Sequence, residues 1–314
     1  MEQDLQLDES VRLGDLVEQL DLLPEVVRLR ETVDTWIEES SPEMRDMFTW
    51  QLIGRTKNYR PCTIFSCYTA VYDGPVSDEV MLSAVGLDMY HNISLIIDDI
   101  LDRSRHRRNK LTLHCRFGNL PALMFAGYLM AECMNRVSDD AFAVEQLAEL
   151  MKRLGVAECL QWRLRRHPLG VEDWRMIAGE DTGTMFEICA RLGTRDNRLK
   201  RYGLLLGTLY HGCDDVADVR GSEALGGGGN EDIQDRIVTL PAAIAVRDPY
   251  VASLFRSTDD HTEVLQQRFS TALPEAEQVL DKIAAEAIAE ALRNAQRPAR
   301  LIRLVEYTRE LSRA

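Results

Sequence analysis

Apolar residues recur along most of the chain at the three- and four-residue spacing of amphipathic helices. Residues 274–293 show this clearly, because they open with a proline and acidic residues and then place apolar side chains on one face. These apolar residues are Val279, Leu280, Ile283, Ile288 and Leu292. Residues 78–101 are almost continuously apolar, which predicts a helix deep inside the fold. A further long helix is expected from about 198 to 219, and strand patterns are nearly absent, so we predict an all-α protein.

Two breaks interrupt the helical pattern. Residues 103–110 (RSRHRRNK) are basic and end the apolar helix at 78–101. Residues 221–230 (GSEALGGGGN) contain four consecutive glycines, which predicts a loop. We find no internal repeat and no linker that would divide the chain, so a single domain over residues 1–314 is expected.

Composition narrows the classes of function. Hydrophobic residues make up 45% and charged residues 28%, which is typical of a globular protein with a sizeable core. The formal net charge of -14 argues against a nucleic-acid partner. The apolar tract at 121–130 is too short to span a bilayer, and the first ten residues are acidic and polar, so no integral membrane segment is expected. Seven cysteines without paired spacing favour reduced thiols and a cytoplasmic location.

Aspartates gather near the ends of two predicted helices. The first cluster is Asp98, Asp99 and Asp102 in SLIIDDILD, and the second is Asp214, Asp215 and Asp218 in GCDDVADVR. The first and last aspartates of each cluster are four residues apart and share one helical face. Like charges at this spacing repel, so carboxylates on an apolar helix need a compensating cation. Oxygen ligands of this kind suit Mg²⁺, which completes its coordination with water and substrate phosphate.

The number of clusters matters for the interpretation. One such motif can be a solvated helix end, but two, each preceded by apolar residues, are much stronger evidence for a site. Two metal-bearing walls can hold one diphosphate between them and neutralise its charge as it leaves. The chemistry indicated is ionisation of an allylic carbon–oxygen bond, with the carbocation shielded from water by the apolar bundle.

Longer stretches around these clusters resemble the trans-isoprenyl diphosphate synthases. The segments that carry the resemblance are TKNYRP at 56–61, HNISLIIDDILDRSRHRRNKLTLHCRFG, DTGTMFEICARLG, YHGCDDVADV with EDIQDRIVTLP, and EYTREL near the end. Most occur in family order between about residues 54 and 241. The resemblance implies a single helical bundle of the prenyltransferase type, with about ten or more helices around a deep apolar cavity, and a homodimer.

The resemblance also implies roles for individual residues. The aspartates that it assigns to Mg²⁺ or its waters are Asp98, Asp99, Asp102, Asp214, Asp215 and Asp218. The positions that would hold isopentenyl diphosphate are Lys57, Arg60, His91 and Arg108. Those on the side of the allylic diphosphate are Arg107, Thr182 and His211. A diphosphate outside the metal site needs such cationic or donor side chains, although each residue alone could be an ordinary surface cation or core histidine.

Three positions depart from the family pattern. Asp181 replaces a lysine in DTGTMF, Ile237 replaces another, and His211 replaces a glutamine. Asp181 should repel the allylic diphosphate unless it meets a cation, such as Arg236, or an extra metal ion. These departures keep two alternatives open: a class I terpene synthase on the same fold, which ionises and cyclises its substrate, and a non-catalytic partner subunit of a prenyltransferase.

The expected activity is Mg²⁺-dependent condensation of an allylic diphosphate with isopentenyl diphosphate, because the residues for the second diphosphate are complete. The growing chain should pass residues one and two helical turns before Asp98. Ser94 is small and Ile93 intermediate, whereas Tyr90 is bulky enough to form a floor. In the family that the chain resembles, a bulky aromatic residue at the nearer positions commonly stops growth at about fifteen carbons. With the floor one turn deeper, the resemblance implies a product of about C20, the geranylgeranyl class, and the limit should be discrete because packed interiors do not yield smoothly to an added isoprene unit.

Overall fold

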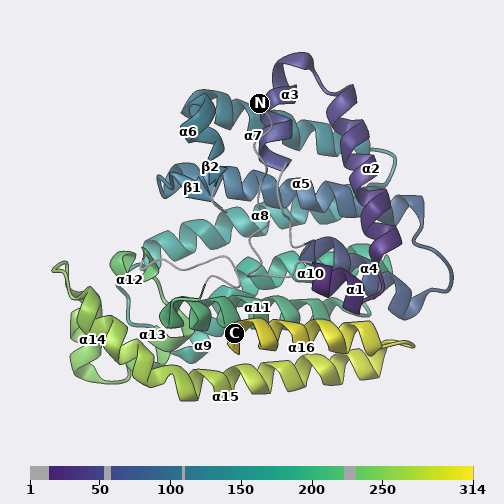
Figure 1. The fold of residues 1–314 in the computed structure, drawn as a ribbon. Coiled ribbons are helices and arrows are strands. Elements are labelled where there is room, and N and C mark those ends of the chain that lie inside the picture. Colours follow the sequence, from purple (N-terminus) through teal and green to yellow (C-terminus); the bar gives the residue numbers. More distant parts are fainter. Residues whose placement is uncertain (1–13, 53–57, 108–109, 223–230, 314) are drawn as a thin grey trace.

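The computed structural model describes residues 14–52, 58–107, 110–222 and 231–313, which form a nearly all-helical bundle (Figure 1). The α-helices are α1 (Gly14–Gln19), α2 (Leu23–Glu39), α3 (Pro42–Leu52), α4 (Tyr59–Val71), α5 (Asp78–Leu101), α6 (Leu113–Phe117), α7 (Asn119–Arg136), α8 (Ala141–Leu164), α9 (Val171–Ala178), α10 (Thr184–Thr194), α11 (Lys200–Arg220), α12 (Glu231–Asp235), α13 (Leu240–Ala245), α14 (Pro249–Arg256), α15 (Thr262–Asn294) and α16 (Ala299–Arg313). A π-helical turn, η1 (Gly179–Gly183), and two strands, β1 (His106–Arg107) and β2 (Lys110–Leu111), complete the described elements. The all-α prediction is confirmed.

Helix α5 spans the range predicted from its apolar run and is a core helix. The Ser77 side chain caps its first turn by accepting a hydrogen bond from the Val80 amide. By length and composition α5 could cross a membrane, but 67% of its most apolar window is buried inside the bundle. The helix ends at Leu101, and the two strands that follow it, β1 and β2, pair antiparallel as a hairpin. This hairpin brings Arg107 back beside the end of α5.

Helix α11 packs against η1 and α10 on one side and against α15 and α16 on the other (Figure 1). Two glycines allow its backbone to lie directly against that of its neighbours. A Cβ atom at Gly203 would be 2.3 Å from the Phe186 carbonyl oxygen, and one at Gly207 would be 2.5 Å from the Thr182 carbonyl oxygen. The part of α11 that lies about two turns before the second aspartate cluster is therefore held against η1.

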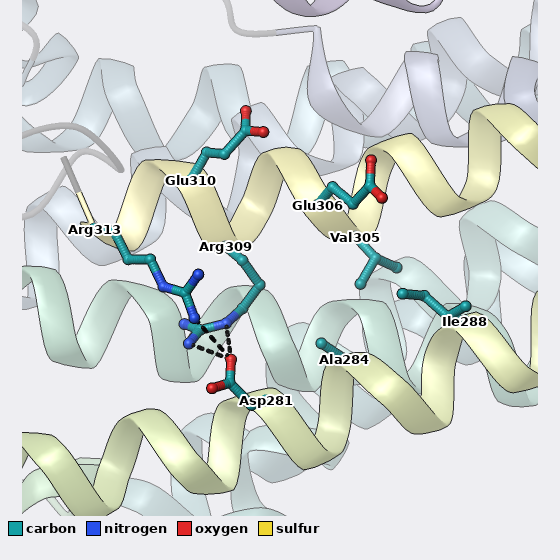
Figure 2. A pocket seen from close by; sticks show the side chains of 8 residues that line it. All are labelled: Asp281, Ala284, Ile288, Val305, Glu306, Arg309, Glu310 and Arg313. Carbon is teal, nitrogen blue, oxygen red and sulfur yellow. Dashed lines mark hydrogen bonds and ion pairs between the residues drawn. The ribbon is translucent and has the colours of Figure 1, made fainter.

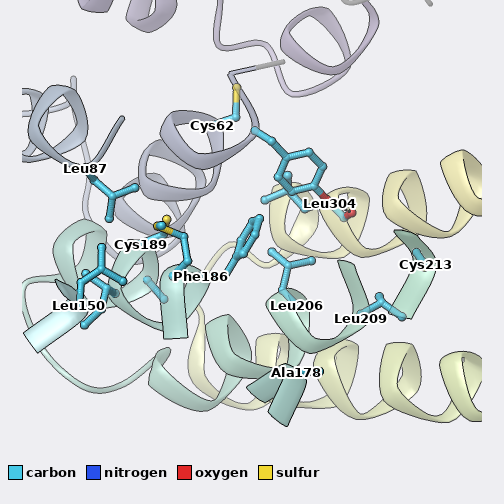
Figure 3. Packing of buried hydrophobic residues seen from close by; sticks show 14 of the residues in the cluster. Cys62, Leu87, Leu150, Ala178, Phe186, Cys189, Leu206, Leu209, Cys213 and Leu304 are labelled. Atoms are coloured by element: carbon cyan, nitrogen blue, oxygen red, sulfur yellow. Dashed lines mark hydrogen bonds between the residues drawn. The ribbon is translucent and has the colours of Figure 1, made fainter. Parts of the chain in front are cut away.

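The buried core forms one cluster that includes residues from Leu16 to Tyr307. Figure 3 shows its middle, where Phe186 of α10 lies among Leu206 of α11 and Leu304 of α16. Two buried tyrosines donate hydrogen bonds to carbonyl groups of α16: Tyr59 to Leu304 (2.9 Å) and Tyr202 to Leu301 (2.8 Å). All seven cysteines are free thiols, and five of them are buried.

One predicted boundary was wrong. The helix expected at 274–293 begins twelve residues earlier, at Thr262, and Pro274 lies inside it. Proline cannot donate a hydrogen bond to the carbonyl one turn before it, which normally disfavours this position. Here Leu265 and Phe269 are buried on the same face before the proline, so packing continues the helix through it.

The close contact of α11 makes a stability prediction. Replacing Gly203 with Ala places a methyl group against backbone, and the free energy of unfolding should fall by about 1–3 kcal/mol. A matched control is Gly155→Ala on α8, where a Cβ atom would meet nothing within 4 Å. That variant should be unchanged or slightly more stable, since alanine favours helices. Urea denaturation of both variants tests the contact, which is refuted if Gly203→Ala is as stable as Gly155→Ala.

Candidate diphosphate and metal site

Acidic side chains from α5, α8, η1 and α11 lie near one another at one end of the bundle. Asp98 lies in the last turn of α5, and its charged neighbours include Glu158 of α8 and Asp181 of η1. Asp181 in turn contacts His211 of α11, one turn before the second cluster. The structure therefore links the two predicted aspartate walls through η1.

Asp98 and Glu158 are both hard to ionise in this protein. Burial, with help from the charge of Glu158, raises the pKa of Asp98 to about 7. Burial and the charges of Asp181 and Asp102 raise the pKa of Glu158 to about 7. Glu158 was not predicted, because a single glutamate on a long helix carries no local signal. Both carboxyl groups need a cation before they ionise fully at neutral pH.

Asp99 and Asp215 each use an oxygen for a contact within the protein. Asp99 Oδ1 accepts a hydrogen bond from Arg107 Nε (2.8 Å), which ties the hairpin to α5. Asp215 Oδ2 accepts bonds from Trp174 Nε1 and from the Leu240 amide, both at 2.8 Å. Burial nevertheless raises the pKa of both carboxyl groups. These hydrogen bonds join the first cluster to the hairpin and the second cluster to α9 and α13.

Trp174 was also missed from the sequence, and a glycine explains its position. The indole of this α9 residue lies against α11 at Gly212, where a Cβ atom would be 2.8 Å from its Cζ2 atom. A larger residue at position 212 would push the ring away from Asp215. The glycine is visible in the sequence, but its partner on another helix is not.

Asp181 meets a cation, but this cation is His211. The His211 Nδ1 atom lies 3.3 Å from Asp181 Oδ2 and 3.0 Å from the hydroxyl oxygen of Thr182, which donates to Asp181. Burial opposes a charge on His211, but Asp215, Asp181 and Asp214 outweigh it and raise its pKa to about 10. Burial also acts on Asp181, yet its bonds to His211 and Thr182 keep its pKa below the ordinary value.

The expectation that Arg236 would serve as this cation was wrong. Its guanidinium donates instead to backbone carbonyls, those of Ile233 and Asp259. The residue has a left-handed backbone conformation (φ 57°) between α12 and α13 and its side chain is buried there. Ile237 beside it supplies no charge.

Comparison with known proteins decides the family. A sequence profile described as polyprenyl synthetase matches residues 42–285, more than three quarters of the chain. The chain belongs to the polyprenyl synthetase family. It is a prenyltransferase of isoprenoid biosynthesis, an isoprenyl diphosphate synthase by family.

Individual relatives of the chain carry several product names. It is 26% identical to a nonaprenyl diphosphate synthase of Mycobacterium tuberculosis, over 95% of this chain and 96% of that one. It is 24% identical to geranylgeranyl pyrophosphate synthase 4 of Arabidopsis thaliana, over 82% and 78%. A heptaprenyl diphosphate synthase structure from Staphylococcus aureus superposes with a TM-score of 0.83 at 19% identity, covering 93% of this chain and 98% of that one. A polyprenyl synthase from Caulobacter crescentus, complexed with calcium and isoprenyl diphosphate, gives 0.81 at 20% identity, over 96% and 99%. These structures confirm the fold.

Two of the four residues expected to hold isopentenyl diphosphate belong to the described part of the chain. Lys57 and Arg108 lie outside the described residues. Arg60 lies in the first turn of α4, with its guanidinium carbon 5.8 Å from the centre of the Phe186 ring. His91 is half-buried on α5, which packs against α4. The two described members thus come from adjacent helices.

The three residues expected to limit product length differ in burial. Tyr90 and Ile93 are fully buried, and Ser94 is half-buried with its hydroxyl bonded to the His91 carbonyl (2.9 Å). Burial raises the pKa of Tyr90 to about 12. Within the described part of the chain, the Tyr90 hydroxyl has no hydrogen-bond partner. A tyrosine in this environment contributes mainly the volume of its ring.

A separate pocket between α15 and α16 is lined partly by charged side chains that pair with one another (Figure 2). Arg309, from the EYTREL segment, and Arg313 both bond to Asp281, at 2.8 and 2.9 Å. Arg309 also reaches Cys213 Sγ of α11 (3.6 Å), next to the second aspartate cluster. This C-terminal arginine fastens α16 to α11.

The raised pKa of Glu158 predicts how stability depends on pH. The folded protein keeps this proton up to about pH 7, whereas the unfolded chain releases it near 4.5. The metal-free wild type should therefore lose stability as the pH rises through this window. Glu158→Gln does not titrate, so its stability relative to wild type should increase from pH 4.5 to 7 and level off above. Denaturation in metal-free buffers measures this, with Glu149→Gln, on the same helix, as the control. A flat difference for Glu158→Gln would contradict the placement of Glu158.

Proposed function

We propose that the protein uses Mg²⁺ to condense an allylic diphosphate with isopentenyl diphosphate, head to tail, and releases pyrophosphate. The observation that supports this most is the acidic end of the bundle, where the charges of Glu158 and Asp181 act on Asp98 and where His211 links Asp181 to the second cluster. Such a concentration of carboxylates destabilises the protein unless cations join them, and a metal–diphosphate substrate brings those cations.

The donor set fits a hard cation that keeps part of its coordination for other ligands. Among the described residues, no three His, Cys, Asp or Glu side chains are close enough to hold one metal ion unaided. The oxygen donors that we propose for this task are Asp98, Asp99 and Asp102 at the end of α5, where Asp102 is the C-cap, and Asp214, Asp215 and Asp218 on α11. Mg²⁺ commonly binds through one or two carboxylates, waters and substrate phosphate. When bound, it would stabilise the negative charge of the departing pyrophosphate.

The surrounding residues have three roles in this proposal: they hold the clusters in place, bind the second diphosphate and line the path of the growing chain. Asp99 and Asp215 hold the hairpin, Trp174 and the α13 backbone in place through the bonds described above. Arg60 and His91, together with Lys57 and Arg108, would bind the diphosphate of isopentenyl diphosphate. The apolar residues of α5 would line the path of the growing chain and keep water from the allylic cation.

A terpene synthase activity is the second candidate, and one relative favours it. A dolasta-1(15),8-diene synthase of Colletotrichum gloeosporioides is 30% identical over 48% of this chain, but only 21% of that protein is covered. Elongation agrees better with the near-complete coverage of the diphosphate synthases. A partner subunit without activity is disfavoured, because both aspartate clusters are intact.

We also propose a homodimer in the cytoplasm. Helix α7 exposes Leu120, Leu123 and Met124 at 70%, 48% and 59%, on one face. An exposed apolar face of this kind favours association with a second copy. The seven free thiols are compatible with a reducing compartment.

Product analysis tests the proposed reaction. The protein is incubated with Mg²⁺ and an allylic diphosphate, with and without isopentenyl diphosphate, and the organic and phosphatase-treated aqueous fractions are analysed. We expect longer prenyl alcohols only when both substrates are present. Arg60→Met should raise KM for isopentenyl diphosphate with little effect on ionisation of the allylic substrate. Asp98→Asn, the control for contaminating activity, should lower turnover by at least about two orders of magnitude. Hydrocarbon formation without isopentenyl diphosphate would favour the cyclase instead.

For product length we propose about C20, the geranylgeranyl class. Tyr90 is eight residues before Asp98, about 12 Å along the helix axis, and it is fully buried. Ser94 and Ile93, in the turn between, leave more room than an aromatic side chain. The names of the relatives range from geranylgeranyl to nonaprenyl, so they do not determine this length.

Two substitutions test the floor at Tyr90. Tyr90→Ala should lengthen the product, because it removes the ring that stops the chain, and Ile93→Phe should shorten it, because it adds a ring closer to Asp98. Chromatography of the dephosphorylated prenyl alcohols measures both. If neither variant shifts the distribution, the floor lies elsewhere in the bundle.

A further inference from the structure

The π-helical turn η1 carries Asp181 and Thr182, and it is the only such turn among the described elements. A π-helical turn widens the helix by one residue and leaves carbonyl groups without their usual amide donors. The Thr184 hydroxyl compensates by donating to the carbonyls of Glu180 (2.7 Å) and Gly179 (3.3 Å). Because such turns are less stable than regular helix, η1 needs support from its neighbours.

Arg153 of α8 provides this support on the outer side. Its Nε and Nη2 atoms each lie 3.1 Å from a different carboxylate oxygen of Glu180, the fork arrangement that arginine forms with carboxylates. Its Nη1 atom is 3.2 Å from Glu187 of α10, whose side chain is only 2% exposed. One guanidinium group therefore joins α8 to η1 and to the first turn of α10.

Helix α11 supports η1 on the inner side. The Thr182 carbonyl oxygen lies against the backbone at Gly207, and the side chains of Asp181 and Thr182 bond to His211 one turn later. The His211 Nε2 atom is 3.8 Å from Asp215 Oδ1. A shift of η1 away from α11 would thus break the bonds that orient His211 between the two carboxylates.

We propose that Arg153 and Glu180, the Arg153–Glu180 clamp, are positioning residues that set the affinity of the site for the allylic diphosphate and its metal ions. The clamp fixes η1 against α11, so that Asp181, Thr182 and His211 keep their mutual bonds. Neither Arg153 nor Glu180 is assigned any contact with substrate. This inference rests on the function proposed above.

Glu180→Gln tests the clamp with little risk to folding, because the Glu180 side chain is 52% exposed. We expect KM for the allylic diphosphate, and the Mg²⁺ concentration for half-maximal rate, to rise about tenfold, the size of effect seen when supporting residues of metal ligands are lost. KM for isopentenyl diphosphate should not change. Arg153→Gln should act in the same direction, and Arg153→Lys, which keeps the charge but loses the fork, should be intermediate. Glu149→Gln, whose partner Lys152 is on the same helix, is the matched control.

A binding measurement separates this inference from the proposed reaction. Calorimetric titration with inorganic pyrophosphate in the presence of Mg²⁺ reports the site without turnover, and Glu180→Gln should bind about tenfold more weakly than wild type. If Glu180→Gln lowers kcat and thermal stability but leaves KM for the allylic diphosphate and pyrophosphate affinity unchanged, the clamp is only structural and the proposal is overturned. If the variant weakens pyrophosphate binding while wild type makes no elongated product, the clamp stands and the proposed reaction fails.

Discussion

The direct contact between the backbone of α11 and that of η1 and α10 is the constraint on which the site depends. At Gly203 and Gly207 no side chain separates the helices, so α11 cannot slide or rotate without a clash. This fixes the register between residues 181–182 and residue 211, and through α11 it fixes the second aspartate cluster. Elsewhere along the same helix, Gly212 admits the indole that holds Asp215. Small residues therefore place the charged groups, although they carry no chemistry.

In the absence of ligands, the burial and mutual repulsion of carboxylates at the acidic end of the bundle lower the stability of the protein. The charges of Glu158 and Asp181 act on Asp98, and the unfavourable charge of these carboxyl groups is relieved in two ways. Asp98 and Glu158 retain protons near neutral pH, whereas Asp181 is paired with an imidazolium. The protein thus tolerates these carboxyl groups through protonation and pairing. In the reaction proposed above, metal ions would take the place of the protons.

The sequence predicted the features of the molecule that depend on residues close together in the chain. Helix α5 was predicted at its observed bounds because its apolar residues are contiguous in the sequence. Both aspartate clusters were visible for the same reason. The bounds of α15 were wrong because burial of Leu265 and Phe269 overrides a proline whose local meaning is a helix start. Glu158, Trp174 and Arg153 were missed because each acts on a residue far away in sequence, and no short pattern records such a partner. The same holds for Asp181: Arg236 was named as a possible cation, but the cation that contacts Asp181 is His211, 30 residues away on α11.

The thiols divide into two groups with different reactivity. Burial raises the pKa of Cys62 and Cys189 to about 12, so these sulfurs stay protonated and closed to reagents at neutral pH. Only Cys115 and Cys159 are exposed. Cys159 follows Glu158 directly on α8, while Cys115 lies on α6. Alkylating spectroscopic probes would therefore attach at two known points of the wild-type sequence without engineered cysteines, one next to Glu158 and one on a different helix.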